Sequence, residues 1–335
     1  MTRVRVHTGK AGADMEDSSL SDLTTFMSEN SGGWIDIFQP EEEPTREFLQ
    51  QKMGFHRLAV DDCFEEPASR NFVYKNHKFT TFKARDADRE LDTEYLRSFL
   101  HEGWLITVRH AHMPGIAEFR KRIRSKNFIK DGMMNTEYLL YQLLDSVADD
   151  WMKVLSRQSD RLDELEDQVF DPRQKYPNLL EDLHEIKGEL REIAKSTTPL
   201  DDVIQGMLRS TDNFVTEETD LYYRDLADLT HSIVTRIENY SSGAASTRDT
   251  YISQTSMRLA ESQAETAEVM RLLTIIATIM LPITAVASIF GMNVQSFGAG
   301  TGPVDLKVIL SLMAGIGGGL LMWLYFKGYI GGKRR

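Results

Sequence analysis

Residues 270–293 read MRLLTIIATIMLPITAVASIFGMN. Within 272–292 there is no charged residue, and most side chains are aliphatic. As a helix, this run would be about 30 Å long at about 1.5 Å per residue, which matches the hydrocarbon thickness of a bilayer. A second apolar run covers 308–326. The pattern predicts two transmembrane helices, 272–292 and 308–326, joined by a loop over 293–307.

The composition of the whole chain is that of a largely soluble, acidic protein. Its 335 residues include 39 Lys and Arg and 51 Asp and Glu, for a formal net charge of −12. This length is enough for one or two packed domains before the apolar runs. The negative charge opposes binding to phosphate, so we expect no nucleic-acid partner. A single cysteine, Cys63, excludes an internal disulfide and a multi-thiolate zinc site.

The ends of the chain predict its orientation in the membrane. No apolar stretch occurs near the N-terminus, so we expect no cleavable signal peptide. The C-terminal tail, 327–335, is basic, and Arg271 stands at the start of the first span. Because positively charged residues favour the cytoplasmic side, we expect a multi-pass protein of the inner (plasma) membrane. Both termini would be cytoplasmic, with the loop over 293–307 outside.

Upstream of the spans, short β-like runs precede long helical ones. Residues 1–33 are polar with little periodicity, which predicts a flexible leader. Over 34–130, runs rich in β-branched and aromatic residues alternate with short helix-like segments. The predicted strands cover 34–38, 71–74, 78–84 and 104–109. This alternation predicts an α+β cytosolic domain, in which a mixed sheet is flanked by helices.

Residues 131–213 have a helical pattern with dense negative charge. Apolar residues recur at spacings of mostly three and four, and Pro172 ends the first helix. A second helix, 179–208, is expected to be interrupted near Pro199, and the two should pair as an antiparallel hairpin. We interpret the acidic residues of the first helix as a solvated face, with an electrostatic reservoir for cations as the alternative. They are Asp149, Asp150, Asp160, Asp163, Glu164, Glu166 and Asp167.

Residues 214–271 predict one long helix that continues into the first span. Apolar and aromatic residues step by four and three, close to a heptad, and no proline interrupts them before Pro282. A seam of this kind needs partner helices, and two spans per chain cannot enclose an aqueous path. The sequence therefore predicts a stalk helix in a homo-oligomer whose copies surround an axis.

The heptad of the stalk, extended through the first span, predicts which residues face the axis. They are Thr266, Met270, Leu273, Ala277, Leu281, Thr284, Ser288 and Gly291. Met270 and Leu273 would form apolar rings at the cytosolic end, and a narrow apolar ring obstructs ions because water leaves it readily. Thr284 and Ser288 would form hydroxyl rings further along. The alternative is that this stripe only packs helices together.

The end of the first span carries a motif. The segment FGMN at 290–293 closes the span, after the run LTIIATI and PIT at 282–284. In this position the motif resembles that of the CorA family of divalent-cation transport proteins, and the Trp-Ile-Asp strand at 34–36 resembles the start of that family's cytosolic domain. The resemblance implies a funnel-shaped homopentamer that passes Mg²⁺ into the cytosol, with Co²⁺ or Ni²⁺ as further candidate ions. The chain has no phosphate-loop or nucleophile-plus-base motif, so we expect no enzymatic activity.

The resemblance assigns ion selection to Gly291, Met292 and Asn293. Mg²⁺ dehydrates reluctantly, and a ring of neutral amide oxygens from Asn293 can hydrogen-bond its waters without removing them. Gly291 would allow close helix approach, and Met292 would anchor the turn. The alternative for Asn293 is an ordinary helix C-cap.

The resemblance also implies that Mg²⁺ bound at subunit contacts holds the pore shut. The matching acidic positions are Asp225, within YYRD at 222–225, and Asp86 and Asp88 in an acidic loop. Ions bound there would stabilise the closed state, and their loss would free the stalks to open. Mg²⁺ would then be both the transported and the regulatory ion.

Several residues depart from the family pattern. Phe290 stands where Tyr is usual, Val294 where an aromatic residue is usual, and Ala267 where an asparagine is usual. The loop after Asn293 reads VQSFGAGTGPVD, with no acidic residue before Asp305. These differences keep open a ZntB-type transporter of the same fold, which moves Zn²⁺ with protons. A third alternative is a membrane-anchored metal sensor without transport.

Overall fold

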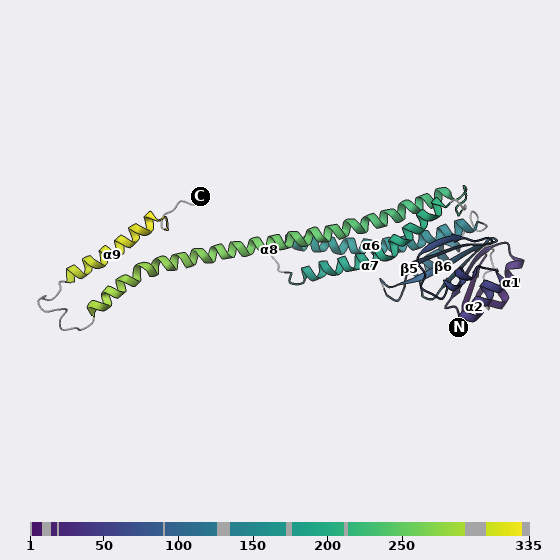
Figure 1. Ribbon diagram of the computed structural model, residues 1–335, viewed down its shortest axis with the longest axis horizontal. Helices are drawn as coiled ribbons and strands as arrows, with labels where there is room; N and C mark the ends of the chain where they lie inside the picture. The colour runs from purple at the N-terminus through teal and green to yellow at the C-terminus, as the bar shows by residue number, and fades with distance from the viewer. Residues whose placement is uncertain are drawn as a thin grey trace. The chain divides into compact units, whose positions relative to one another are not determined.

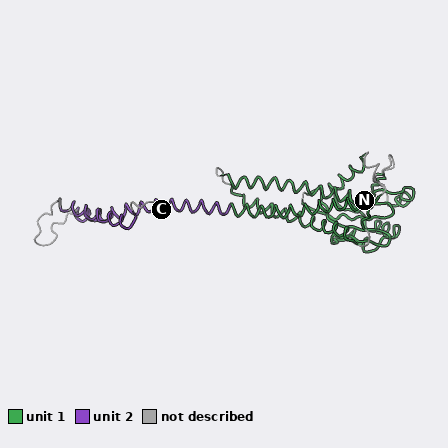
Figure 2. Tube along the Cα trace, turned by 90° about the horizontal axis from the view of Figure 1, so that it is seen from above, with its two compact units in different colours: residues 1–250 green, residues 251–335 purple. Residues whose placement is uncertain are grey.

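The computed structural model describes residues 2–8, 15–18, 20–89, 91–125, 135–171, 176–210, 214–291 and 306–329. The chain divides into two compact units, Met1–Thr250 and Tyr251–Arg335 (Figure 2). The first unit holds the sheet, its covering helices and the beginning of the longest helix. The second unit holds the rest of that helix and the last helix of the chain.

One mixed sheet forms the framework of the first unit (Figure 1). Its seven strands lie in the order β2-β1-β3-β7-β6-β5-β4. They are β1 (Arg3–His7), β2 (Met15–Ser18), β3 (Gly33–Phe38), β4 (Arg70–Val73), β5 (Lys78–Arg85), β6 (Thr93–His101) and β7 (Trp104–Arg109). Strands β3 and β7 pair in parallel, and the other neighbours pair antiparallel. Both β3 and β7 are buried at every position, as strands covered on both faces should be.

Helices cover both faces of the sheet. On one face lie α1 (Leu20–Glu29), α2 (Glu42–Arg46), the π-helical turn η1 (Glu47–Lys52) and α3 (Arg57–Asp61), around a core that includes Ile35, Phe48 and Ile106. On the other face lie α4 (Pro114–Ile123), α6 (Thr136–Phe170) and α7 (Leu179–Arg209). There the ring of Trp34 packs edge-on against Phe119 of α4, with 4.8 Å between ring centroids.

The prediction of a flexible leader over 1–33 does not hold. This segment contains β1, β2 and α1, and Val4 and Val6 of β1 are fully buried. The register pairs Val4 with Ile37 and Val6 with Ile35. The strand therefore forms because β3 supplies its hydrogen-bonding partner, and the local sequence carries little sign of it.

The helices α6 and α7 form a hairpin, and α7 contains Pro199 without interruption. The predicted break near this proline is therefore wrong. Proline removes one backbone hydrogen bond from a helix, which is costly in isolation. Here the flanking residues Ile193, Leu200 and Val203 are buried, so packing of the helix against its neighbours outweighs the lost bond.

The longest helix, α8 (Asp220–Gly291), begins in the first unit and ends in the second. In the first unit its buried seam includes Leu226, Ile233, Ile237 and Ala244. This seam packs within the chain: Thr247 donates a 2.8 Å hydrogen bond to Glu166 of α6. The partner helices that the heptad pattern requires over this part of α8 are thus supplied by the same chain.

In the second unit, α8 is exposed at every residue over 255–274. The helix α9 (Leu306–Phe326) contacts its last part, where Gly317 lies against Ile283. Among the described residues, α8 is the one helix long and apolar enough to cross a membrane, and Leu310–Phe326 within α9 is a shorter apolar helix. The predicted stalk and first span thus fall in one continuous helix.

Candidate functional site

The last part of α8 has two distinct faces. Residues in an α-helix advance by about 100° each, so Ile275, Ile279, Ile283 and Val286 share one side. All four are partly buried. The residues predicted to face an axis lie on the opposite side, and every one of them is exposed in the single chain. They are Thr266, Met270, Leu273, Ala277, Leu281, Thr284, Ser288 and Gly291.

The helix α9 accounts for this difference. Its shielded residues, Met313, Ile316, Gly317, Leu320 and Leu324, recur at helical spacing and form one stripe. A Cβ atom at Gly317 would lie 3.2 Å from Cδ1 of Ile283, so the two backbones approach closely there. Small residues allow this kind of packing between membrane helices. The helix α9 therefore covers one side of α8 and leaves the predicted axis side bare.

The hydroxyl of Thr284 is partly committed to its own helix. It donates a 2.8 Å hydrogen bond to the carbonyl oxygen of Met280, one turn earlier. Thr274 and Thr278 make equivalent bonds to Met270 and Thr274. Such a bond uses the hydroxyl proton and leaves the oxygen free to accept. The bare side of α8 can thus present an acceptor oxygen to a hydrated cation at Thr284.

The predicted selectivity residues lie at the limit of the described chain. Gly291 is the last residue of α8, and nothing in the described part of the chain lies within 4 Å of a Cβ atom placed on it. Met292, Asn293 and the loop that follows them lie outside the described residues. Their assignment to ion selection stays a prediction.

The predicted sensing residues occupy two separate elements of the first unit. Asp225 is exposed on α8, and Asp86 and Asp88 form a tight turn in which the amide of Asp88 donates a 3.0 Å hydrogen bond to the Asp86 carboxylate. Within the described residues, no three or more His, Cys, Asp or Glu side chains are grouped so that they could hold a metal ion. Asp86, Asp88 and Asp225 therefore make no metal site within one chain.

Asp225 is nevertheless part of an acidic neighbourhood. Burial raises the pKa of Tyr141 on α6 to about 12, and the charges of Asp145 and Asp225 add to that rise. Burial also raises the pKa of Asp145 against the opposing effect of Arg122, with Asp149 and Asp225 contributing. Arg122 of α4 bridges Asp145 and Asp149. Arg122 thus offsets part of the negative charge around Asp145.

The acidic residues of α6 divide into two groups. Asp149 and Asp150 are held by arginines of the same chain, and Asp150 accepts two hydrogen bonds of 2.9 Å from Arg85. Glu166 accepts a hydrogen bond from Thr247. The remaining four of the acidic residues predicted for this helix are all exposed, as a solvated face would be. They are Asp160, Asp163, Glu164 and Asp167.

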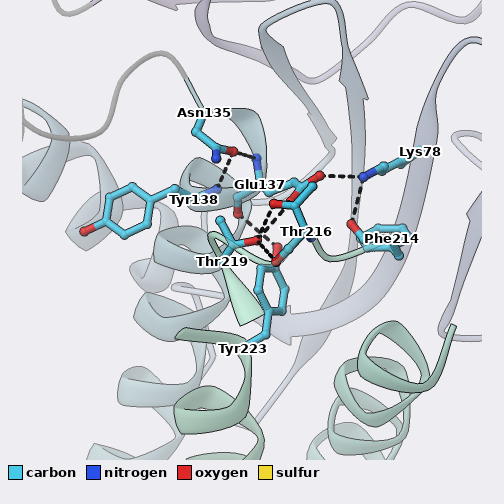
Figure 3. Close-up of polar contacts among 8 residues, drawn as sticks. All are labelled: Lys78, Asn135, Glu137, Tyr138, Phe214, Thr216, Thr219 and Tyr223. Atoms are coloured by element: carbon cyan, nitrogen blue, oxygen red, sulfur yellow. Dashed lines mark hydrogen bonds and ion pairs between the residues drawn. The ribbon is translucent and has the colours of Figure 1, made fainter. Parts of the chain in front are cut away.

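A buried carboxylate that the sequence patterns did not single out joins α8 to the rest of the first unit (Figure 3). Glu137, in the first turn of α6, is 7% exposed and forms a 2.6 Å ion pair with Lys78 of β5. It also accepts hydrogen bonds from Thr216 and Thr219, which lie directly before α8. The one local signal was the capping pattern Asn135-Thr136-Glu137, which marks the start of α6 without predicting these partners.

Comparisons with known proteins agree with this architecture. Residues 29–334 match the family model described as "CorA-like Mg2+ transporter protein". The cobalt/magnesium transport protein CorA of Thermotoga maritima is 26% identical over 319 residues, covering 94% of this chain and 87% of that protein. The complete structure of the CorA magnesium transporter from Methanocaldococcus jannaschii matches with a TM-score of 0.66 and 19% identity, covering 98% of this chain and 99% of that one.

A second branch of the same fold also matches. The ZntB cytoplasmic domain from Vibrio parahaemolyticus has a TM-score of 0.61 and 15% identity, covering 76% of this chain and 98% of that one. At such identities the two structural likenesses show the fold alone.

Proposed function

The chain belongs to the CorA-like Mg²⁺ transporter family, and we propose that it passes Mg²⁺ through a membrane into the cytosol, down the electrochemical gradient of the ion. The observation that carries this proposal is the bare side of α8, opposite the side covered by α9. An anchor helix would need only apolar side chains. This side instead adds the hydroxyls of Thr284 and Ser288 to an apolar stripe.

The functional unit in this proposal is a homo-oligomer, most simply a pentamer, embedded in lipid. The residues over 255–274 are exposed all round the helix in one chain, and such a helix needs neighbours to be stable. Two spans per chain cannot surround water. Copies of α8 arranged about an axis would bury their bare sides against each other and form the path, with the α9 helices outside.

Ion passage would be controlled at both ends of this path. Met270 and Leu273 would form apolar rings that obstruct ions at the cytosolic end. Asn293 would hold hydrated Mg²⁺ at the outer end through amide oxygens, beside Gly291 and Met292. A divalent ion that enters an inside-negative cell gains about 4.6 kcal/mol per 100 mV, twice the value for one charge, so no other energy source is needed. Co²⁺ and Ni²⁺ are further candidate ions.

We further propose that cytosolic Mg²⁺ closes the path. Asp225 of one copy would share an ion with Asp86 and Asp88 of the next, because these residues make no site within one chain. The ion would bind the closed assembly more tightly than the open one, which shifts the population towards closure. The acidic neighbourhood of Asp225 favours a cation at this surface.

The proposed topology has two spans, α8 and α9, in the plasma membrane. Both termini would face the cytosol. The basic tail and Arg271 support this orientation.

The second candidate function is Zn²⁺ transport coupled to protons, as in the ZntB branch. The loop after Asn293 favours it, since no acidic residue precedes Asp305. A membrane-anchored metal sensor without transport is the third candidate. The hydroxyl groups on the bare side of α8 argue against it, because a helix that only anchors the chain has no need of them.

One experiment separates the three candidates. The purified full chain is reconstituted in liposomes that hold a trapped dye for Mg²⁺ or Zn²⁺, with and without a pH gradient, and compared with Asn293→Ala. We expect Mg²⁺ uptake that follows the membrane potential, ignores the pH gradient and is lost in the variant. Zn²⁺ uptake that depends on the pH gradient would favour the second candidate. Uptake of neither ion would leave only the sensor.

A further inference from the structure

Glu137 is the point at which three elements of the first unit meet (Figure 3). Its side chain lies between Lys78 at the start of β5 and the turn that opens α8, while its backbone belongs to the first turn of α6. Both carboxylate oxygens are occupied. Oε1 accepts from Nζ of Lys78 at 2.6 Å. Oε2 accepts from the amide of Thr216 at 2.9 Å, its hydroxyl at 2.7 Å and the hydroxyl of Thr219 at 2.9 Å.

This carboxylate of α6 holds the turn that leads into α8, close to the positive end of that helix. The first amides of a helix have no partner within it, and its positive end favours an anion. The turn that opens α8 starts at Thr216, whose carbonyl oxygen accepts from the amide of Asp220 at 2.9 Å. Glu137, 79 residues away in the chain, binds the amide of Thr216 and so fixes the turn from which α8 starts.

Two further contacts fix the same place. The hydroxyl of Tyr223, a fully buried residue of α8, donates a 3.0 Å hydrogen bond to the backbone oxygen of Glu137. Lys78 donates a second hydrogen bond, of 2.8 Å, to the carbonyl oxygen of Phe214. The segment before α8 and the first turn of α8 are therefore both tied to β5 and α6.

The ion pair between Glu137 and Lys78 bears on the geometry of this junction as well as on its stability. A buried ion pair adds little stability beyond what apolar side chains of the same volume would give, because both ions lose their hydration. It does specify geometry, since the carboxylate is satisfied only when the donors of β5 and α8 are all in place. Burial raises the pKa of Glu137, but hydrogen bonds from Lys78 and Thr216 outweigh it and hold the pKa below its usual value.

We propose that Glu137 is the positioning residue through which the sheet layer controls α8. A shift of β5 or α6 moves the carboxylate, and the turn over 216–219 that leads into α8 must follow or lose its hydrogen bonds to Glu137. This inference rests on the proposed function: the far end of the same helix carries the bare side assigned to the pore. In that setting, the junction sets the cytosolic Mg²⁺ concentration at which transport stops.

The test uses a matched pair of variants in the full chain. Glu137→Gln keeps the shape of the side chain but removes the charge that holds Lys78. Asp150→Asn is the control, because Arg85 and Asp150 also join β5 to α6 through a shielded ion pair, and the contacts described for it include none to α8. The two readouts are hydrogen exchange of the amides over 219–226 and the cytosolic Mg²⁺ concentration that halves transport in liposomes.

We expect Glu137→Gln to speed hydrogen exchange of the amides in the first turns of α8 by about tenfold or more. The Mg²⁺ concentration that halves transport should shift by about fivefold or more, which is the lower end of the range for allosteric coupling. Asp150→Asn should leave both readouts within about twofold of the wild type. Adding Lys78→Met to Glu137→Gln removes the stranded charge. The double variant should recover thermal stability but not the wild-type Mg²⁺ dependence of transport. If Glu137 had a purely structural role, the two properties would recover together.

Equal readouts for Glu137→Gln and Asp150→Asn would overturn the proposal. If Glu137→Gln fails to fold, Thr219→Val removes a single hydrogen bond to the carboxylate and should shift both readouts in the same direction by a smaller factor; an unchanged Thr219→Val would then count against it. A wild-type protein that transports neither ion would overturn the proposed function instead. Hydrogen exchange of the α8 amides would still show whether Glu137 anchors that helix.

Discussion

Cδ1 of Ile283 on α8 lies 3.2 Å from the position that a Cβ atom of Gly317 on α9 would take. This contact fixes which side of α8 the second apolar helix covers. The side it leaves bare is the side that carries Met270, Leu273 and Thr284. The packing of α9 therefore decides which residues of α8 remain available to line a path.

Gly317→Leu should disrupt this packing. A larger side chain at a close helix contact forces the helices apart, at a cost of about 1–3 kcal/mol. We expect a lower thermal midpoint for the protein in detergent. Gly318→Leu is the control, because nothing in the described chain lies within 4 Å of a Cβ at Gly318. An equal drop in the thermal midpoint of both variants would show that the Gly317 contact has no special part in the packing of α9.

The apolar ring assigned to Leu273 can be tested by making it polar. Leu273→Ser should hold water in the narrow part of the path and so raise Mg²⁺ uptake when cytosolic Mg²⁺ is high. Leu272→Ser is the control, since the neighbouring residue points about 100° away around the helix. Uptake at high cytosolic Mg²⁺ is measured in liposomes for both. A leak in Leu272→Ser alone would place the constriction on a different side of α8.

The pattern of α8 could be predicted from sequence because it depends on one period. Residues at spacings of three and four lie on one side whatever the helix packs against, so Met270, Thr284 and Ser288 could be placed together. The sequence does not say which side α9 covers. That follows from the contact of Gly317 with Ile283, and Gly315, Gly318 and Gly319 nearby offered the same local signal.

Elements that depend on distant partners were missed. The strand β6 carries Arg97 in its buried part, where the guanidinium donates to the backbone oxygens of Asp62 and Glu65. A charged residue at that place hides the strand pattern. Glu137 is a further case, because its partners Lys78 and Thr216 lie 59 and 79 residues away in the chain. No local window contains both.

The histidine at the β4–β5 turn should make the first unit sensitive to acid. Burial, with smaller contributions from the nearby His101 and His56, lowers the pKa of His77 to about 4. The unfolded chain takes up this proton at a higher pH than the folded one. The contribution of His77 to the free energy of unfolding is therefore fully present above about pH 6.5 and is lost as the pH drops towards about 4.

The expected loss is on the order of 2 kcal/mol between about pH 7 and about pH 5. His77→Phe should flatten this part of the stability profile, because its ring can keep the contacts with Phe55 and Tyr74 but binds no proton. Unfolding midpoints in denaturant at each pH give the measurement. His184→Gln, at an exposed position of α7, should keep the wild-type slope. A His77→Phe profile with that same slope would assign the acid sensitivity to other groups.

Asp36 should be among the most sensitive positions for folding. It is fully buried, and accepts from Arg109 at 3.0 and 2.8 Å and from Arg120 at 2.9 Å. Asp36→Ala would leave two arginines without their carboxylate, at a cost of about 3–5 kcal/mol. The unfolding midpoint can be followed by tryptophan fluorescence, to which Trp34 in the same layer contributes. Asp22→Ala, on the exposed side of α1, is the control.

The sensing role of Asp225 gives a prediction that does not require transport. If Mg²⁺ at this residue holds copies of the chain together, the stalk part of α8 should resist protease better as the Mg²⁺ concentration rises. Asp225→Asn keeps the size of the side chain and removes its charge. We expect the Mg²⁺ concentration for half protection to rise by about tenfold or more, which corresponds to about 1.4 kcal/mol of lost binding free energy.

Asp228→Asn separates a specific site from general negative charge, because Asp228 is also exposed on α8, one turn further on. It should leave the protection curve unchanged. The same shift in both variants would indicate that Mg²⁺ acts on the overall charge of the surface. Unchanged protection in Asp225→Asn would remove this residue from the sensor and leave the acidic turn at Asp86 and Asp88 to be tested alone.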